Sequence, residues 1–236
     1  RDAGRHECVS APHQYPTTGM LSAERRWRLM TVAAKYNFRI IEDDYDHDCQ
    51  YWREPDMPLA SMGRDGNVIY IVTLSKVIAP TLRVGYMVPP ADLMSRCMNE
   101  VTQIDRHGNT VTEIAIAELM ENGEIQRHTR RMLQTYSKRR ETLIQLLASL
   151  PPMATFEAPQ TGLAFWLQVS KQLDIQELCR IAAREGVMLT PTRTCANFDK
   201  KIQGIRLGFG DLNTTQITTG IRRLATAFNT LRGATL

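Results

Sequence analysis

Long apolar runs are missing from this sequence. No stretch approaches the roughly 18 consecutive apolar residues that a membrane-spanning helix needs, although 43% of the 236 residues are hydrophobic. Because 23% of the residues are charged, the composition is that of a globular protein with enough chain for a sizeable core. The sequence therefore predicts no membrane-spanning helix, and either one large domain or two modest ones.

Paired cysteines are missing too. The five cysteines are scattered, odd in number and without a C-x-x-C pair, which argues against a disulfide framework or a zinc site. The five histidines lack zinc-like spacing. Asp44, Asp46 and Asp48 begin like a calcium loop, but Cys49 and Pro55 stand where that loop needs glycine and glutamate. We therefore expect no metal, reduced thiols and a cytoplasmic location.

A strong charge of either sign is also absent. The net charge of +4 is mild, so it permits a nucleic-acid partner without arguing for one. Basic residues concentrate in one helical stretch, where a solvated helix face is the default interpretation and DNA contact is the alternative. These residues are Arg127, Arg130, Arg131, Lys138, Arg139 and Arg140.

One stretch of the sequence combines a buried strand with reactive side chains. Residues 68–72 (VIYIV) are β-branched and aromatic, which is typical of a fully buried strand. Lys76 follows at once, and a lysine at the mouth of a buried strand can lose solvation and become an amine nucleophile. Thr73, Ser75 and Arg83 add two hydroxyls and a guanidinium, which suit a phosphate, although small hydroxyls after a strand are often simple caps.

A second predicted strand, residues 39–41, runs into acids and a phenol. Alternation along the strand sends Asp43 and Tyr45 to one side. Glu42 and Asp44 then face the other side, as competing acids. Ligands of an open α/β sheet bind at the carboxyl ends of its strands. A lysine, a carboxylate, a tyrosine and a phosphate clamp gathered there suggest pyridoxal phosphate (PLP).

Five segments, in order and across almost the whole chain, resemble a known family. The pattern is similar to fold-type-I PLP-dependent proteins of the class I/II aminotransferase group. It is most similar to the aminotransferase-like domain of MocR-type regulators, a branch of the GntR-like transcription factors. The aspartate-x-tyrosine spelling and the histidine-glutamine pair before the proline favour this regulator branch. The segments are 12–19 (PHQYPTTG), 40–46 (IIEDDYD), 73–85 (TLSKVIAPTLRVG), 127–132 (RHTRRM) and 205–209 (IRLGF).

The resemblance implies a role for each candidate residue of the strand ends. Lys76 would form an internal aldimine with the cofactor, and Asp43 would keep the pyridine nitrogen protonated. Tyr45 would donate to the phenolic oxygen. Arg83 would hold the phosphate, helped by the two hydroxyls named above. The structural alternatives are a surface lysine, a solvated acid and a packed core tyrosine.

Arg206 is an arginine in an otherwise apolar predicted strand. A buried arginine needs an anion, because an unpaired buried charge is costly. A structural salt bridge would meet that need, whereas the resemblance implies the carboxylate of a substrate or effector.

Ordinary aminotransferases carry asparagine where Tyr15 stands, so the roles of His13, Gln14 and Tyr15 stay open.

We expect an α/β fold of two domains. Residues 1–150 would form the C-terminal part of a fold-type-I large domain with a mixed, mostly parallel sheet, and residues 151–236 a smaller α+β domain. Ser22 is expected to cap a helix that ends at Asn37. Its apolar residues are expected to pack on the sheet; they are Trp27, Leu29, Met30, Val32, Ala33 and Ala34. In the second domain we predict strands at 163–169, 187–190 and 204–209 and helices at 174–185 and 214–231.

The sequence thus predicts the effector-sensing domain of a MocR-type regulator that holds PLP on Lys76 and senses an amino compound or PLP itself. The alternative is an aminotransferase that moves an amino group between an amino acid and a 2-oxo acid. The family carries more of the large domain, and a helix-turn-helix, before this point, so we expect a fragment that contacts DNA only through such a domain. A piece unable to hold the cofactor alone is a third possibility, and a homodimer is expected by analogy.

Overall fold

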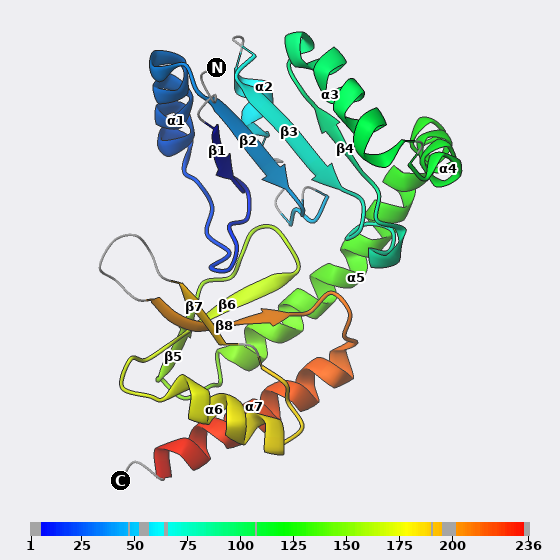
Figure 1. Cartoon of the computed structure of the whole chain (residues 1–236). Coiled ribbons are helices and arrows are strands. Elements are labelled where there is room, and N and C mark those ends of the chain that lie inside the picture. Colours follow the sequence, from blue (N-terminus) through cyan, green and yellow to red (C-terminus); the bar gives the residue numbers. More distant parts are fainter. Residues whose placement is uncertain are drawn as a thin grey trace. The chain divides into compact units, whose positions relative to one another are not determined.

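The structure is a computed structural model that describes residues 6–46, 48–51, 57–63, 66–106, 108–189, 191–194 and 202–233. These residues form two compact units. The first contains the described residues up to Gln14 together with Gly19–Arg131. The second contains Tyr15–Thr18 and the described residues from Met132 onward. Figure 1 labels the helices and strands of both.

A four-stranded sheet in the order β1-β2-β3-β4 organises the first unit. The first three strands are parallel and β4 runs antiparallel to β3, so the sheet is mixed and mostly parallel, as predicted. Every second residue of β3 is only half-buried, so the fully buried strand that the sequence predicts is buried mainly on one face. The strands are β1 (His6–Val9), β2 (Arg39–Asp44), β3 (Val68–Thr73) and β4 (Gly85–Val88).

Helix α1 (Ala23–Tyr36) packs on this sheet. As predicted, the Ser22 side chain caps its first turn, and Asn37 ends it in the left-handed conformation. The expected packing of Trp27 is wrong, because its side chain is 61% exposed. The expected packing is confirmed for Leu29, Met30 and Ala33, which belong to the core cluster of this unit, and Trp27 lies about 120° around the helix from Ala33.

Further helical segments follow along the described chain up to residue 147. The long helix α5 begins in the first unit and ends in the second. These segments are α2 (Leu59–Met62), the 3-10 turn η1 (Pro80–Leu82), α3 (Ala91–Asp105), α4 (Thr110–Glu121) and α5 (Glu124–Leu147).

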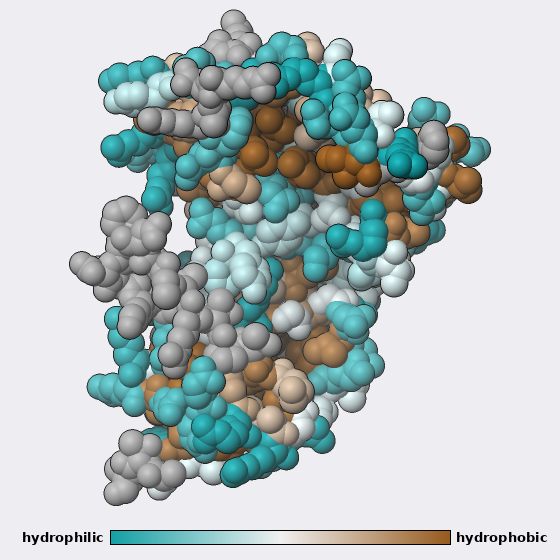
Figure 2. Space-filling model, in the orientation of Figure 1, coloured by the Kyte–Doolittle hydropathy of each residue, from teal (hydrophilic) through white to brown (hydrophobic). Residues whose placement is uncertain are grey.

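An exposed apolar surface extends over β4, α3 and α4 of the first unit. Apolar side chains are exposed in all three elements, and brown atoms gather around the α3 and α4 region in Figure 2. Clusters of this kind mark interaction surfaces more often than single exposed apolar residues do. The apolar surface comprises Met87, Val88, Met94, Met98, Val101, Ile104, Val111 and Ile114.

The second unit is a four-stranded antiparallel sheet in the order β5-β6-β8-β7, with two helices at its side (Figure 1). Its core includes Phe165, Leu167, Ile205, Leu224 and Phe228, all fully buried. The strand β5 was not predicted. The elements are β5 (Ala154–Phe156), β6 (Ala164–Val169), α6 (Ile175–Arg184), β7 (Pro191–Thr194), β8 (Ile202–Gly208) and α7 (Thr214–Gly233).

The predicted strand at 187–190 is wrong over residues 187–189, and residue 190 lies outside the described residues. Gly186 has a positive φ of 78°, and the N–H of Val187 donates to the carbonyl of Ala182 at 2.8 Å. Val187 therefore belongs to the closing turn of α6, a common helix ending.

The two units meet in sequence inside α5, between Arg131 and Met132, whereas the sequence analysis places a domain boundary after the helix. Ile125 is buried in the first unit, and Leu143 and Leu147 are buried in the second. A continuous helical pattern gives no sign that its two ends pack on different units.

Candidate functional site

The functional ends of the strands of the first unit lie at one edge of the sheet. Because β2 and β3 are parallel and Asp44 pairs with Val72, their carboxyl ends are neighbours. The antiparallel β4 brings its first residue, Gly85, opposite Thr73 at the same edge. This strand-end edge carries every candidate cofactor residue of the first unit. They are Asp43, Tyr45, Thr73, Ser75, Lys76 and Arg83.

Glu42, the first acid at the end of β2, has a structural role. Its side chain is fully buried, and its two carboxylate oxygens accept the N–H groups of Leu59 and Ala60 at 2.9 and 3.1 Å. Burial raises the pKa of this carboxyl, and the two backbone donors oppose that shift. Glu42 therefore anchors the start of α2 and is not available to a ligand.

Asp44 is also committed to the interior. It is buried, and it accepts a hydrogen bond from the Tyr70 hydroxyl at 2.8 Å. Asp43, on the other side of the strand, is half-buried. Burial, and then the charge of Asp44, raises the pKa of the Asp43 carboxyl. Of the three consecutive acids, Asp43 is thus the one whose carboxylate can meet a ligand.

Tyr45 lies on the half-buried side with Asp43, but its hydroxyl is engaged within the protein. It donates to the carbonyl oxygen of His13 at 2.7 Å, and the two rings meet edge to face with centroids 5.8 Å apart. His13 is 2% exposed, and its Nε2 lies 3.8 Å from the Asp46 carboxylate. A phenol has one proton, so Tyr45 can donate to a cofactor only if it gives up its hydrogen bond to the His13 carbonyl.

Lys76 lies in a tight turn directly after β3. The N–H groups of Val77 and Ile78 both donate to the Leu74 carbonyl, at 3.2 and 2.9 Å. The Lys76 side chain is exposed, so the loss of solvation that the sequence suggests is not observed. Burial raises the pKa of the Cys49 thiol, whereas the positive charge of Lys76 lowers it. This interaction indicates that the Lys76 amine lies near Cys49, in the loop after β2.

Two hydroxyls beside Lys76 are arranged for an anion. Ser75 Oγ is buried and has no hydrogen-bond partner within the described residues. Thr73 Oγ1 accepts the N–H of Ser75 at 3.2 Å, so its own proton is left to donate. A buried hydroxyl without a partner is unfavourable. A phosphate oxygen would satisfy both donors.

Arg83 completes this set of anion-binding groups. It is exposed and sits just before β4 in the left-handed conformation, with φ 50° and ψ 40°. For a side chain other than glycine this costs about 1 kcal/mol, and such conformations concentrate at ligand sites. Together with the orphaned Ser75 hydroxyl, the guanidinium makes the strand-end edge fit a phosphorylated cofactor.

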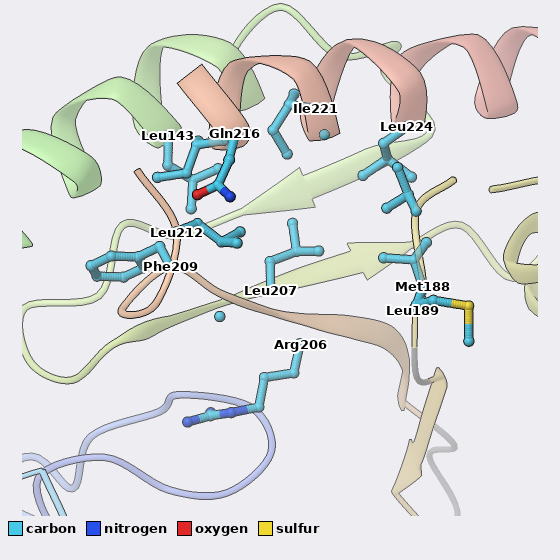
Figure 3. Close-up of a pocket in the computed structure, with 14 residues that line it drawn as sticks. Leu143, Met188, Leu189, Arg206, Leu207, Phe209, Leu212, Gln216, Ile221 and Leu224 are labelled. Atoms are coloured by element: carbon cyan, nitrogen blue, oxygen red, sulfur yellow. The ribbon is translucent and has the colours of Figure 1, made fainter. Parts of the chain in front are cut away.

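Arg206 lies in the second unit, on β8. Its Nη1 donates to the Pro16 carbonyl at 3.3 Å, and its guanidinium carbon lies 5.3 Å from the centre of the Tyr15 ring. Figure 3 shows the side chain leaving β8 on the side opposite Leu207, toward the loop that contains these two residues. Tyr15, whose role the sequence leaves open, is thus a neighbour of the candidate carboxylate ligand.

An apolar pocket of about 150 Å³ lies on the other side of β8, against α7. Leu207, Leu212 and Ile221 point into it, and Gln216 brings the amide (Figure 3). The Arg206 guanidinium points away from this space. The pocket is therefore distinct from the candidate carboxylate site.

The basic stretch of α5 is partly structural. Arg139 donates to the Gly210 carbonyl, and Arg140 donates to the Pro159 carbonyl at 2.9 Å. Arg127 is paired with Glu124 one turn earlier. Guanidinium groups bonded to the protein's own backbone are poor candidates for phosphate contacts. The other four basic residues of this stretch are exposed, as the solvated-face interpretation expects.

One important contact was not predicted. Tyr70 donates to Asp44, and alternation along β2 and β3 could have suggested it, since register brings the same faces of the two strands together.

No group of metal-binding side chains occurs among the residues that the structure describes, and no described helix is long and apolar enough to cross a membrane.

The chain is similar to known proteins both in sequence and in structure. Residues 6–224 match the family model "Aminotransferase class I and II". The multiple substrate aminotransferase of Thermococcus profundus has a similar structure, with a TM-score of 0.89 and 25% identity, covering 98% of this chain and 57% of that one. The predicted fold, α/β of the fold-type-I aminotransferases, is thereby confirmed.

Two curated relatives are regulators. The uncharacterized HTH-type transcriptional regulator YhdI of Bacillus subtilis is 31% identical over 92% of this chain and 46% of its own length. The probable rhizopine catabolism regulatory protein MocR of Rhizobium meliloti is 26% identical over 96% of this chain and 46% of its own. The chain therefore spans about half the length of these relatives. On the match across residues 6–224, this chain belongs to the class I and II aminotransferase family, which is PLP-dependent.

Proposed function

We propose that this chain is the PLP-binding effector domain of a MocR/GntR-type transcription regulator. The gathering of Asp43, Lys76, Arg83 and the orphaned Ser75 hydroxyl at one sheet edge carries the cofactor half of the proposal. The similarity to YhdI, an HTH-type transcriptional regulator, and to MocR, a probable regulatory protein, supports the regulatory half.

Each residue of the strand-end edge has one task in this proposal. Bound PLP supplies an aldehyde that condenses with amines, releasing water, and a ring that withdraws electrons. Lys76 holds the cofactor covalently through its ε-amine. Asp43 would pair with the pyridine nitrogen and hold its proton. Arg83, Ser75 and the Thr73 hydroxyl hold the phosphate. Tyr45 fixes the ring position after it exchanges the His13 carbonyl.

Arg206 is proposed to bind the carboxylate of the sensed amino compound. Its guanidinium is half-buried beside an apolar core, a setting that favours an anionic partner. One N–H is directed to Pro16 and one face to Tyr15, and the planar guanidinium has the geometry that a bidentate carboxylate needs.

The second candidate function is amino-group transfer between an amino acid and a 2-oxo acid. The likeness to the Thermococcus profundus aminotransferase, which covers 98% of this chain, favours it. Incubation of the PLP-loaded protein with a panel of amino acids discriminates the two. A regulator domain is expected to bind an amino acid without steady release of 2-oxo acid, whereas an aminotransferase releases it continuously once a 2-oxo acceptor is present.

DNA contact is proposed only through a helix-turn-helix domain outside these residues, since the described arginines of α5 that hold backbone carbonyls serve the fold. Pairing with a second copy of the chain is proposed through the apolar surface over β4, α3 and α4. A cytoplasmic location is in keeping with the free thiols of Cys8, Cys49, Cys97 and Cys179.

An absorbance titration with PLP tests the cofactor proposal. The wild-type chain should develop a new band that saturates with PLP, and Lys76→Ala should lack it. Lys171→Ala, which removes an exposed lysine of the second unit, is the matched control and should behave as wild type. A titration in which wild type and Lys76→Ala are superimposable would refute the role of Lys76.

A further inference from the structure

The side chain of His128, on α5, forms a hydrogen bond with the turn that carries Lys76. Its Nε2 lies 3.0 Å from the carbonyl oxygen of Val77. The two residues are 51 positions apart in sequence, and both belong to the first unit. The contact is half-buried, where a hydrogen bond competes less with water than at the surface.

The chemistry of this pair fixes its direction. A carbonyl oxygen can only accept, so the histidine Nε2 must carry the proton. The neutral Nε2–H tautomer and the imidazolium both satisfy this condition. The bond therefore persists whether the ring is neutral or charged, as a permanent support requires.

The His128–Val77 hydrogen bond fixes the part of the turn that follows Lys76. Before Lys76, the chain is anchored by Leu74, which is 3% exposed and donates its N–H to the Val84 carbonyl at 3.0 Å. After Lys76, the N–H groups of Val77 and Ile78 turn back to Leu74. The Val77 carbonyl points out of the turn and meets His128. Lys76 is thus the exposed residue between two fixed points.

We propose that His128 is a positioning residue for Lys76: by holding the Val77 carbonyl, α5 fixes the turn from which the Lys76 amine meets the cofactor. This inference rests on the proposed function for the role of Lys76. It adds a residue that contacts no cofactor and acts through the backbone. Through this hydrogen bond, α5 contacts the turn that carries Lys76 directly. The same helix continues into the second unit.

Two substitutions separate the hydrogen bond from the packing of the ring. His128→Leu keeps an apolar side chain of similar reach but has no donor, whereas His128→Gln keeps an N–H donor. Gln126→Ala, at an exposed position two residues earlier on α5, is the matched control. Because α5 is also held by the Arg139 and Arg140 hydrogen bonds and by the buried Leu143 and Leu147, all three proteins are expected to fold. Exchange in β8 serves as an internal reference.

Hydrogen exchange followed by mass spectrometry, on the full chain without added cofactor, tests the positioning directly. His128→Leu should raise the exchange of amides 75–78 several-fold, with β8 unchanged, and His128→Gln should restore most of the protection. Equal exchange in His128→Leu and wild type would overturn the inference. So would loss of protection in His128→Gln equal to that in His128→Leu, because the ring and not the donor would then hold the turn.

The rate at which borohydride fixes PLP on Lys76 is the second measurement. It should fall several-fold in His128→Leu and recover in His128→Gln, with Gln126→Ala as wild type. A wild-type rate in His128→Leu despite faster exchange would show that the turn is held but the amine is not positioned, and would overturn the inference. Failure of the wild-type chain to take up PLP would instead refute the proposed function, and the exchange result would still decide whether His128 holds the turn.

Discussion

Single residues at the end of β2 show how three adjacent acids acquire different tasks. Glu42 binds two backbone N–H groups, Asp44 binds the Tyr70 hydroxyl, and Asp43 remains half-buried at the strand-end edge. Strand alternation separates Asp43 from the other two in sequence. The backbone donors that occupy Glu42 come from α2, 17 and 18 residues away, so no pattern in β2 could have predicted them. The contact of Asp44 with Tyr70, 26 residues away, could have been suggested only by pairing β2 with β3.

Tyr70→Phe and Asp43→Asn are expected to have opposite consequences. Tyr70→Phe leaves the buried Asp44 carboxylate without this donor and should lower the free energy of unfolding by about 1.5–3 kcal/mol, with little change in PLP affinity. Asp43→Asn should change stability little and weaken PLP binding strongly. Urea unfolding and PLP titration of both variants check this. Equal stability of Tyr70→Phe and wild type would contradict the structural role given to Asp44.

The buried Glu42 predicts a pH dependence of stability. Burial raises its pKa above the ordinary value of 4.5, so the folded state holds this proton more tightly than the unfolded state does. The resulting stabilisation is present below pH 4.5 and is lost as pH rises through the raised pKa. Glu42→Gln cannot titrate. The stability of wild type relative to Glu42→Gln, from urea unfolding, should therefore fall between acid and neutral pH; a constant difference would contradict this.

Individual elements show where sequence patterns succeed and fail. Helix α1 was predicted from Ser22 to Asn37 because capping is local chemistry. Its packed face was predicted in part: Leu29, Met30 and Ala33 pack in the core cluster, whereas Trp27 is exposed. The strand predicted at 187–190 is wrong over residues 187–189, because Val187 belongs to the closing turn of α6. A short apolar run has the same pattern in a strand and at the end of a helix.

The pairing of β8 with β6 gives a prediction at the scale of an element. A side chain at Gly204 would lie 2.3 Å from the Trp166 ring and 2.7 Å from the Leu167 carbonyl, so Gly204→Ala should destabilise by about 1–3 kcal/mol. Gly220→Ala on α7 is the matched control in the same unit, because nothing lies within 4 Å of its added carbon. It should stabilise by up to about 1 kcal/mol. Thermal unfolding of both variants measures the difference, and a neutral Gly204→Ala would contradict the close strand contact.

For the molecule as a whole, the family and the fold class could be predicted from the sequence, because the five segments are ordered along the chain and alternating patterns define the α/β architecture. The division into domains at residues 1–150 and 151–236 stays a prediction; the two compact units change over within α5, where a continuous helical pattern gives no sign of it. The hydrogen bond of His128 to Val77 was equally invisible, because it joins residues that only the tertiary fold brings together.

The apolar surface predicts association of the whole molecule. Ile104, 76% exposed on α3, is expected to be covered by a second copy. Ile104→Glu should shift the protein toward a lower mass in light scattering, because a buried charge opposes association. Met188→Glu changes an apolar residue of the second unit that is 88% exposed and should leave the mass unchanged. A monomeric wild-type chain, or a dimer insensitive to Ile104→Glu, would contradict the proposed interface.

The most direct test of the central claim is to reduce the PLP-treated chain with borohydride and map the modified residue by mass spectrometry. We predict that the cofactor is fixed on Lys76 in wild type and in Lys171→Ala, and that Lys76→Ala carries none. Modification spread over surface lysines, or persisting at the wild-type level in Lys76→Ala, would contradict a cofactor site at the strand-end edge of this sheet.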